Sequence, residues 1–144
     1  MTRSAPLDIS KIRNLIAGIQ ENLSGLRKIT GSTIEEFITD PNSYPICESH
    51  LRRALEGILT IGTHILSRLL VRSKDYNEII LSLGKHEIIP PEFADRNKKL
   101  AGYRNRLVHL YWEVSKEEIY NVCREHLADI DQFCEYYLEY IRRK

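Results

Sequence analysis

Apolar residues recur along most of this chain at intervals of three and four, which is the spacing of one face of an α-helix. The first such stretch has apolar positions at Ile9, Ile12, Ile16, Ile19, Leu23 and Leu26. Gly31 predicts the end of this helix, and Ser32-Thr33-Ile34-Glu35 predicts a capping box that opens a short helix. The Asp, Pro and Asn residues between positions 40 and 45 predict a loop.

A second long helix is predicted from about Cys47 to Leu70. Its buried side is marked by Leu51, Leu55, Ile58, Ile65 and Leu69, and it is widened by Leu59, Ile61 and Leu66. A stripe this wide indicates contact with more than one neighbouring helix. Surplus apolar surface on the same helix would also favour a homodimer.

Three further helical segments follow. Asp75 is expected to cap a helix that ends at Gly84, and Pro90-Pro91 begins a new segment that reaches Gly102. The stretch from Tyr103 is predicted to be helical and to break near His109, and Ser115 with Glu118 predicts a second capping box at the start of the last helix. The apolar stripe of this last helix comprises Ile119, Cys123, Leu127, Ile130, Phe133, Tyr137 and Ile141.

With no convincing strand pattern, residues 1–144 are predicted to form a single all-α domain. Its expected architecture is an antiparallel, up-and-down bundle of about four long helices with short extra helices.

Composition narrows the possible functions only slightly. The chain has 21 basic and 20 acidic residues, so its net charge of +1 gives no argument for nucleic acid or membrane. No apolar run approaches the roughly 20 residues that span a bilayer, and Met1 to Asp8 contain no apolar signal core, so a cytoplasmic protein is expected. The three cysteines are widely spaced, which predicts buried reduced thiols rather than disulfides, and no metal site or cofactor is expected.

The densest chemistry lies between Tyr103 and Tyr111. This stretch contains two guanidinium groups, an amide, an imidazole and a phenol, contributed by Arg104, Asn105, Arg106, His109 and Tyr111. Arginine binds phosphate through a planar fork of donors, and histidine exchanges a proton near neutral pH. Together Arg104 and His109 could drive the attack of an RNA 2′-hydroxyl on its neighbouring phosphate. Asn105 and Arg106 are candidate supporting contacts.

The spacing of the two main candidates raises a geometric problem. Five residues on an ideal helix turn 500°, which leaves Arg104 and His109 about 140° apart around the axis. The two side chains can converge if the helix ends near His109, if Arg104 reaches back, or if a second subunit contributes one of them. Ser115, as a downstream cap, favours a helix end in this region.

A plainer interpretation exists for the same residues. Arg96, Lys98, Lys99, Arg104 and Arg106 can form a solvated basic surface, and Tyr103, Tyr111 and Trp112 can be packing residues. Glu56 could orient Arg104 across the bundle or form an ordinary surface ion pair. His64, near the apolar side of its helix, is expected to be a core histidine with a hydrogen-bond partner.

The segment Arg104-Asn105-Arg106-Leu107-Val108-His109-Leu110-Tyr111 resembles the signature of HEPN-domain proteins, in particular the HepT-like toxin branch. That branch carries Arg, four residues, His, any residue and Tyr. The similarity extends over most of the chain, from about Ile9 to Tyr140, and includes Arg52-Arg53-Ala54-Leu55-Glu56 and Pro90-Pro91. Many members have an acid after the motif histidine, whereas this chain has Leu110.

The resemblance implies a metal-independent endoribonuclease that acts as a toxin and leaves a 2′,3′-cyclic phosphate. It also implies a homodimer with a shared cleft, in which Arg104 and His109 are catalytic. The implied partner is a small nucleotidyltransferase antitoxin that neutralises the toxin by transferring AMP to Tyr111. Two other functions remain open from the residues themselves: a non-catalytic nucleotide- or RNA-binding module, and a plain protein-interaction bundle.

Overall fold

The computed structural model describes residues 6–144, in which the chain forms seven α-helices and one short 3-10 helix. They are α1 (Ile9–Ile29), α2 (Ile34–Thr39), α3 (Ser43–Arg68), α4 (Tyr76–Lys85), α5 (Pro91–Asn97), α6 (Leu100–His109), η1 (Tyr111–Glu113) and α7 (Lys116–Arg142). No strand occurs between residues 6 and 144, and the predicted all-α class is confirmed. The expectation about a signal segment falls partly on residues 1–5, which lie outside the described residues.

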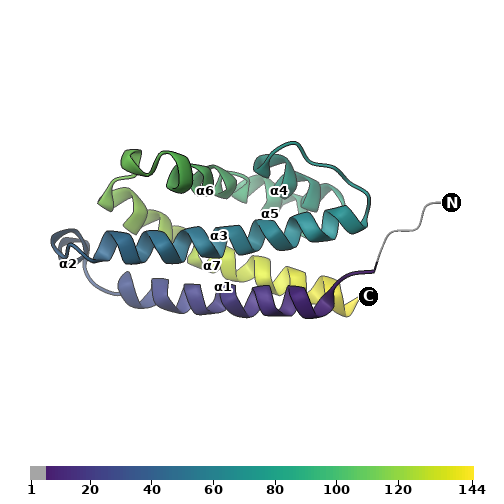
Figure 1. Ribbon diagram of the computed structural model, residues 1–144, viewed down its shortest axis with the longest axis horizontal. Helices are drawn as coiled ribbons and strands as arrows, with labels where there is room; N and C mark the ends of the chain where they lie inside the picture. The colour runs from purple at the N-terminus through teal and green to yellow at the C-terminus, as the bar shows by residue number, and fades with distance from the viewer. Residues whose placement is uncertain (1–5) are drawn as a thin grey trace.

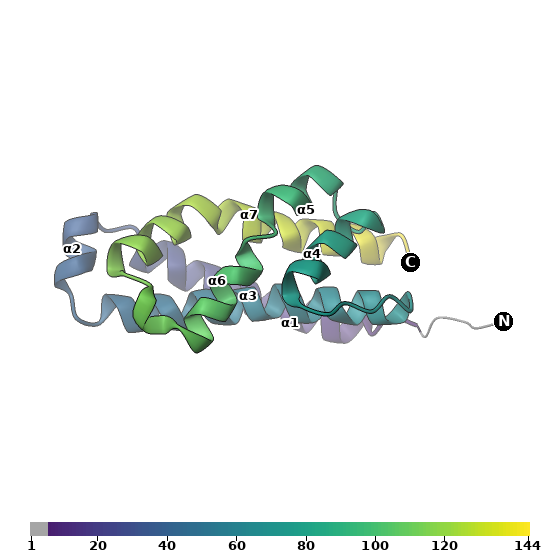
Figure 2. The same ribbon diagram turned by 90° about the horizontal axis from the view of Figure 1, so that it is seen from above.

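The helices form an elongated up-and-down bundle (Figures 1 and 2). The long helices α1, α3 and α7 run along its length, and the fourth side is filled by the shorter α4, α5 and α6 (Figure 1). Helices α3 and α7 run in one direction, whereas α1 and α6 run in the other (Figure 1). The start of α1 and the end of α7 lie at the same end of the bundle, opposite α2 (Figure 1).

Helix α3 is the central element, because it packs against α1, α4, α6 and α7. Its wide apolar stripe is therefore buried from several sides, and Leu55, Ile58 and Ile65 are at most 2% exposed. Leu69, also predicted on the buried side, follows the end of the helix and is 36% exposed. The buried hydroxyl of Tyr137 on α7 donates a hydrogen bond of 2.8 Å to the carbonyl of Ile58, which fixes α7 against α3. Apart from Leu69, the stripe is covered within one chain and so gives no argument for a homodimer.

Close approach of α1 and α3 requires glycine. A Cβ added to Gly57 would lie 2.6 Å from Cγ1 of Ile19, well inside van der Waals contact. Glycine in a helix costs roughly 1 kcal/mol of stability relative to alanine. Here it leaves room for the Ile19 side chain against the backbone of α3.

Several boundaries differ from those predicted. Helix α3 begins at Ser43, so Pro45 lies in its first turn rather than in a loop. Proline is tolerated there because the first N–H groups of a helix have no partner within it. The cap of α2 is Thr33, one residue after the predicted Ser32, and its hydroxyl accepts the N–H of Glu36. Asp75 caps α4 as predicted.

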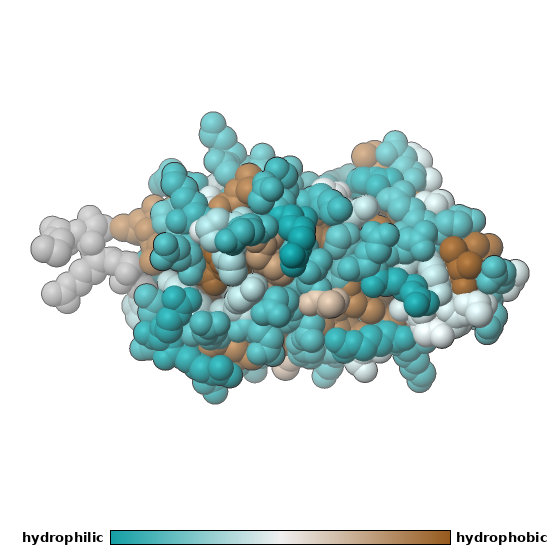
Figure 3. Space-filling view, turned by 180° about the vertical axis from the view of Figure 1, so that it is seen from behind, coloured by the Kyte–Doolittle hydropathy of each residue, from teal (hydrophilic) through white to brown (hydrophobic). Residues whose placement is uncertain are grey.

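The surface is mainly hydrophilic on the face opposite to that of Figure 1, with scattered apolar patches (Figure 3). Among the described residues, no helix combines the length and apolarity required to cross a membrane.

Candidate functional site

Helix α6 carries both main candidates, and it continues through both of them. It runs from Leu100 to His109, so the predicted break near His109 is confirmed, but no helix end lies between Arg104 and His109. Leu100, Ala101 and Leu107 bury one side of the helix. With regular helix between Arg104 and His109, the separation of about 140° around the axis persists within one chain.

Arg104 lies in a largely enclosed position, with its side chain 17% exposed. Its guanidinium carbon lies 4.7 Å from the centre of the Tyr76 ring, a cation–π contact between α6 and α4. Nη1 donates a hydrogen bond of 3.1 Å to Oδ1 of Asn105. Arginine has five N–H donors, and within residues 6–144 this is the one hydrogen bond that Arg104 makes, while its buried Nε has no partner. The group therefore retains donors for an anionic ligand.

Glu56 on α3 approaches Arg104 as the sequence suggested. Its Oε1 lies 3.7 Å from Nη2 of Arg104 and 3.8 Å from Nη1 of Arg52. The contact with Arg104 is an ion pair that is too long for a good hydrogen bond. Glu56 thus holds the arginine by charge, and a phosphate could compete for the same donors.

His109 is the last residue of α6, and it is exposed. The helix ends because Leu110 leaves helical geometry, with φ of −136° and ψ of 37°. Arg104 lines a cleft, whereas His109 does not line that cleft. One chain therefore does not bring the two candidates into a single pocket.

Arg106 has a different position from the one expected of a phosphate contact. Its guanidinium forms a two-pronged ion pair with the carboxylate of Glu118 on α7, in which Nη2 lies 3.0 Å from Oε1. Nη2 also donates a 3.2 Å hydrogen bond to the carbonyl of Glu113. The side-chain hydrogen bond to Glu118 is the main cause that raises the pKa of Arg106. Arg106 thus clamps the end of α6 to η1 and the start of α7.

This clamp also alters the second predicted capping box. The hydroxyl of Ser115 accepts the N–H of Glu118 at 3.0 Å, as expected. The Glu118 carboxylate, however, binds Arg106 rather than returning to the cap.

Tyr111 lies in η1 with 58% of its surface exposed, and the adjacent Trp112 is 67% exposed. Both are too exposed to be the core packing residues of the plainer interpretation. The backbone of Tyr111 is nevertheless anchored, because its carbonyl accepts a 3.0 Å hydrogen bond from the hydroxyl of Tyr44 at the start of α3. Burial is the main cause that raises the pKa of Tyr44.

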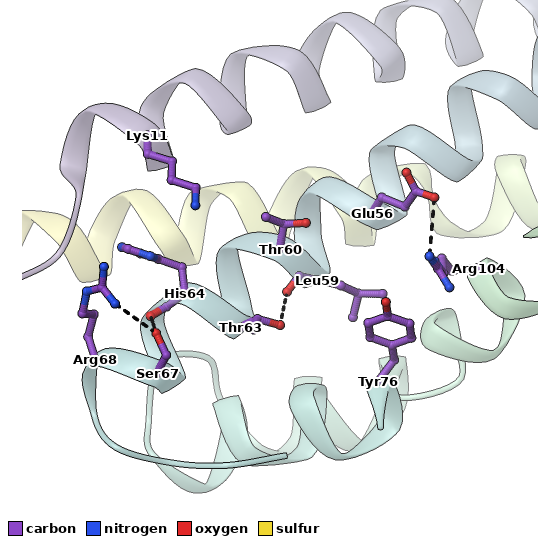
Figure 4. A pocket seen from close by; sticks show the side chains of 10 residues that line it. All are labelled: Lys11, Glu56, Leu59, Thr60, Thr63, His64, Ser67, Arg68, Tyr76 and Arg104. Carbon is purple, nitrogen blue, oxygen red and sulfur yellow. Dashed lines mark hydrogen bonds and ion pairs between the residues drawn. The ribbon is translucent and has the colours of Figure 1, made fainter. Parts of the chain in front are cut away.

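The cleft beside Arg104 has a volume of about 630 Å³ and is formed by α1, α3, α4 and α6 (Figure 4). Arg104, Glu56 and Tyr76 lie at one end of it, and Lys11, His64 and Arg68 lie at the other (Figure 4). Thr60 and Thr63 lie between them (Figure 4).

Sequence reasoning missed the far end of this cleft. A signal was present on α3, where the polar residues Glu56, Thr60, His64 and Arg68 recur every four positions and so form a continuous row. The contribution of Lys11 from α1 and Tyr76 from α4 depends on the packing of helices and had no local signal. His64 has the hydrogen-bond partner that was expected, since its Nε2 accepts the N–H of Asp8 at 3.1 Å.

The basic cluster predicted between Arg96 and Arg106 is mostly paired. Arg96 binds Asp129 at 3.2 Å and Lys98 binds Asp95 at 3.0 Å, in addition to the pairs of Arg104 and Arg106. The acids come largely from α3 and α7, which a local count of charges does not include.

The cysteines are free and buried, as predicted. Sγ of Cys47 and Sγ of Cys123 lie 3.3 Å apart between α3 and α7, and burial raises the pKa of Cys134 to about 12. Within residues 6–144, no three His, Cys, Asp or Glu side chains gather as potential metal ligands.

Comparison with known proteins agrees with this fold. The chain is 30% identical over 122 residues to the tRNA nuclease HepT of Aphanizomenon flos-aquae, which covers 83% of this chain and 80% of that protein. It is 27% identical over 125 residues to the mRNA nuclease HepT of Shewanella oneidensis, with 85% and 92% covered.

Among solved structures, a tri-AMPylated Shewanella oneidensis HEPN toxin in complex with MNT antitoxin aligns with a TM-score of 0.79 and 25% identity, covering 93% of this chain and 98% of that one. The sequence profile described as ribonuclease HepT-like matches residues 19–137. The chain therefore belongs to the HepT-like ribonuclease family.

Proposed function

We propose that this protein is the toxin of a toxin–antitoxin pair and cleaves RNA internally without a metal ion. The observation that carries the proposal is Arg104, a mostly buried guanidinium in a cleft with most of its donors unused. Such a group suits a phosphate, whose charge grows as a transition state forms. The ribonuclease names of two relatives support the same class of substrate.

In the proposed reaction the 2′-hydroxyl of one nucleotide loses its proton and its oxygen bonds to the adjacent phosphorus. The bond from phosphorus to the 5′-oxygen breaks, and that oxygen leaves with a proton. The products are a 2′,3′-cyclic phosphate and a free 5′-hydroxyl. Arg104 stabilises the charge on the phosphate oxygens, and His109 transfers one of the two protons.

We also propose that the working unit is a homodimer, in which Arg104 of one protomer meets His109 of the other. The separation of about 140° on a continuous helix supports this arrangement. A mixture of Arg104→Ala and His109→Ala proteins tests it, because each heterodimer then contains one intact composite site. Random mixing should restore about a quarter of wild-type activity. No restoration in a confirmed heterodimer would place both groups in one chain.

Catalysis is tested by expression and by cleavage of purified RNA. Wild type should arrest growth, and Arg104→Ala or His109→Ala should relieve the arrest. Arg13→Ala, which removes an exposed arginine on α1, is the matched control and should remain toxic. Cleavage should survive EDTA and leave a 2′,3′-cyclic phosphate. Purified wild type that binds RNA without cutting it would instead indicate a non-catalytic RNA-binding module.

Regulation is proposed to occur at Tyr111 through a nucleotidyltransferase antitoxin. The phenolic oxygen would attack the α-phosphorus of ATP, lose its proton and displace pyrophosphate. The exposure of Tyr111 and its place two residues from His109 support this, because attached AMP would bring negative charge and bulk close to the substrate phosphate. Mass spectrometry should find AMP on wild type and not on Tyr111→Phe after incubation with ATP and the antitoxin. Equal labelling of both proteins would exclude Tyr111 as the acceptor.

A further inference from the structure

The end of the cleft away from Arg104 is an electropositive surface that the proposed reaction does not use. Lys11 extends from α1 toward His64, and Arg68 lies beside them at the end of α3 (Figure 4). No carboxylate of residues 6–144 forms an ion pair with Lys11 or Arg68. This distinguishes them from Arg96, Lys98, Arg104 and Arg106, which all have acidic partners.

The net charge of the cleft is positive. Its lining contains three cationic side chains, Lys11, Arg68 and Arg104, and one carboxylate, Glu56, so its net charge is +2, whereas the whole chain carries +1. The positive field is also felt by His64, whose pKa is lowered first by burial and then by Arg68 and Lys11. Asp8 opposes this effect to a smaller degree. The far end therefore attracts anions.

The donors at this end are also suitable for an anion. The N–H of Asp8 donates to Nε2 of His64, so the proton of the neutral ring is carried by Nδ1, which can donate. Arg68 uses Nε for the carbonyl of Pro6 and Nη1 for a long contact of 3.4 Å with Ser67, and Nη2 makes no hydrogen bond to residues 6–144. The ammonium group of Lys11 makes none to the same residues.

The length of the cleft determines what kind of anion fits both ends. Arg68 follows Glu56 by twelve residues on α3, which corresponds to about 18 Å along the helix axis. A strand of stacked nucleotides advances about 3.4 Å per nucleotide, so one nucleotide cannot reach from Arg104 to Arg68. A single strand with several phosphates can reach both ends.

We propose that Lys11, His64 and Arg68 form a second phosphate-binding subsite, which holds the single-stranded RNA substrate several nucleotides away from the bond cut at Arg104. This inference rests on the proposed ribonuclease function. It predicts that the enzyme prefers RNA long enough to occupy both ends of the cleft.

Binding can be measured separately from cleavage in the His109→Ala background. The variant is Lys11→Met with Arg68→Met, and the matched control is Arg13→Met with Lys28→Met, which removes the same charges from exposed positions on α1. A fluorescent RNA of about ten nucleotides is titrated by anisotropy at several salt concentrations. The cleft variant should bind about tenfold more weakly, and its slope of log affinity against log salt should fall by about 1.4, the value for two lost contacts to a single strand. The control should bind like its parent.

Cleavage provides the second measurement. In the active protein, the ratio of kcat/KM for the ten-nucleotide RNA to that for a dinucleotide should fall about tenfold in the Lys11→Met, Arg68→Met variant. Arg68→Lys alone should retain most of this ratio, which a purely structural role of Arg68 at the helix end would not explain. Circular dichroism confirms that each variant is folded.

The outcomes separate the two proposals. Equal loss in the cleft variant and the control would mean that general charge attracts RNA, and the subsite would be wrong. Unchanged binding in a folded cleft variant would also overturn it. If ATP bound as tightly as the RNA and lost as much affinity in the variant, the cleft would take a nucleotide instead of a strand. If the wild type failed to cut RNA while the binding results held, only the catalytic proposal would fail.

Discussion

Replacing Arg106 by methionine distinguishes two functions for this residue. The sequence made Arg106 a candidate supporting contact for the substrate, whereas the structure pairs it with Glu118 and with the carbonyl of Glu113. If the pairing is its role, Arg106→Met should loosen the turn that follows His109. If RNA contact is its role, the fold should be unaffected and RNA binding should weaken.

The size of the effect follows from the environment of the pair. The side chains of Arg106 and Glu118 are 33% and 30% exposed, so solvent screens their attraction in part. An exposed ion pair contributes at most about 1 kcal/mol, and two-pronged geometry places this one near that upper value. With the lost bond to Glu113 of about 1 kcal/mol, Arg106→Met should lower the free energy of unfolding by about 2 kcal/mol. For a chain of this size that corresponds to a fall in Tm of roughly 4–8 °C.

A double-mutant cycle is the assay. The free energy of unfolding is measured by urea denaturation for wild type, Arg106→Met, Glu118→Gln and the double variant. The clamp predicts a coupling of about 1 kcal/mol, since each single change already breaks the pair. Cleavage should fall in both single variants with little further loss in the double variant.

The RNA-contact hypothesis predicts the opposite pattern. It requires that the slope of log RNA affinity against log salt fall by about 0.7, the value for one phosphate, in Arg106→Met. Glu118→Gln should leave this slope unchanged. The clamp would be refuted if the losses of unfolding free energy in the two single variants summed, within about 0.3 kcal/mol, to the loss in the double variant.

Three further predictions concern packing, acid stability and the thiols. Gly84→Ala should destabilise the fold by about 1–2 kcal/mol in urea denaturation, because its Cβ would lie 2.6 Å from that of Ala94 on α5. Burial lowers the pKa of His64 from its ordinary value of 6.5, so below that value the unfolded chain takes up a proton that the folded chain resists. Stability should therefore fall as the pH decreases from 6.5 toward the folded pKa, and His64→Gln should reduce this pH dependence. Native protein at pH 8 should leave the three buried cysteines unreactive toward a thiol reagent, and unfolded protein should expose all three, in line with the pKa of about 12 for Cys134.

The packing prediction has a matched control, and each of the other two has an outcome that would contradict it. Gly18→Ala is the control for the packing prediction, since nothing lies within 4 Å of its added Cβ, and it should stabilise α1. Equal destabilisation by both glycine changes would contradict the packing argument. An acid dependence that is unchanged in folded His64→Gln would contradict the assignment to His64. A fast-reacting thiol in the native state would show that the core opens locally.

The helices were largely predictable because their signals are local. The apolar stripe of α1, the caps Asp75 and Ser115, and the break at His109 each depend on residues within one or two turns. Pro45 misled the prediction of α3, since proline stops a helix in its interior but is accepted in its first turn.

The motif was predictable as a set of residue types, and its surroundings were not. The approach of Glu56 to Arg104 was suggested before the structure, yet the partner of Arg106 was missed because Glu118 seemed committed to its own helix cap. The cleft itself arises from four helices, so its far end depends on how α1 and α3 pack. That packing depends on contacts distant in sequence, such as the glycine approach at Gly57.

The continuous course of α6 through Arg104 and His109 has a consequence for dosage. On the proposal that each catalytic pair is completed across two protomers, activity grows with the square of protein concentration while the chain is mostly monomeric. A cell that makes a few copies would then tolerate them, and harm would begin only above a threshold set by the dimer affinity. The geometry of α6 would thus make toxicity depend on the concentration of the protein, separately from any control by an antitoxin.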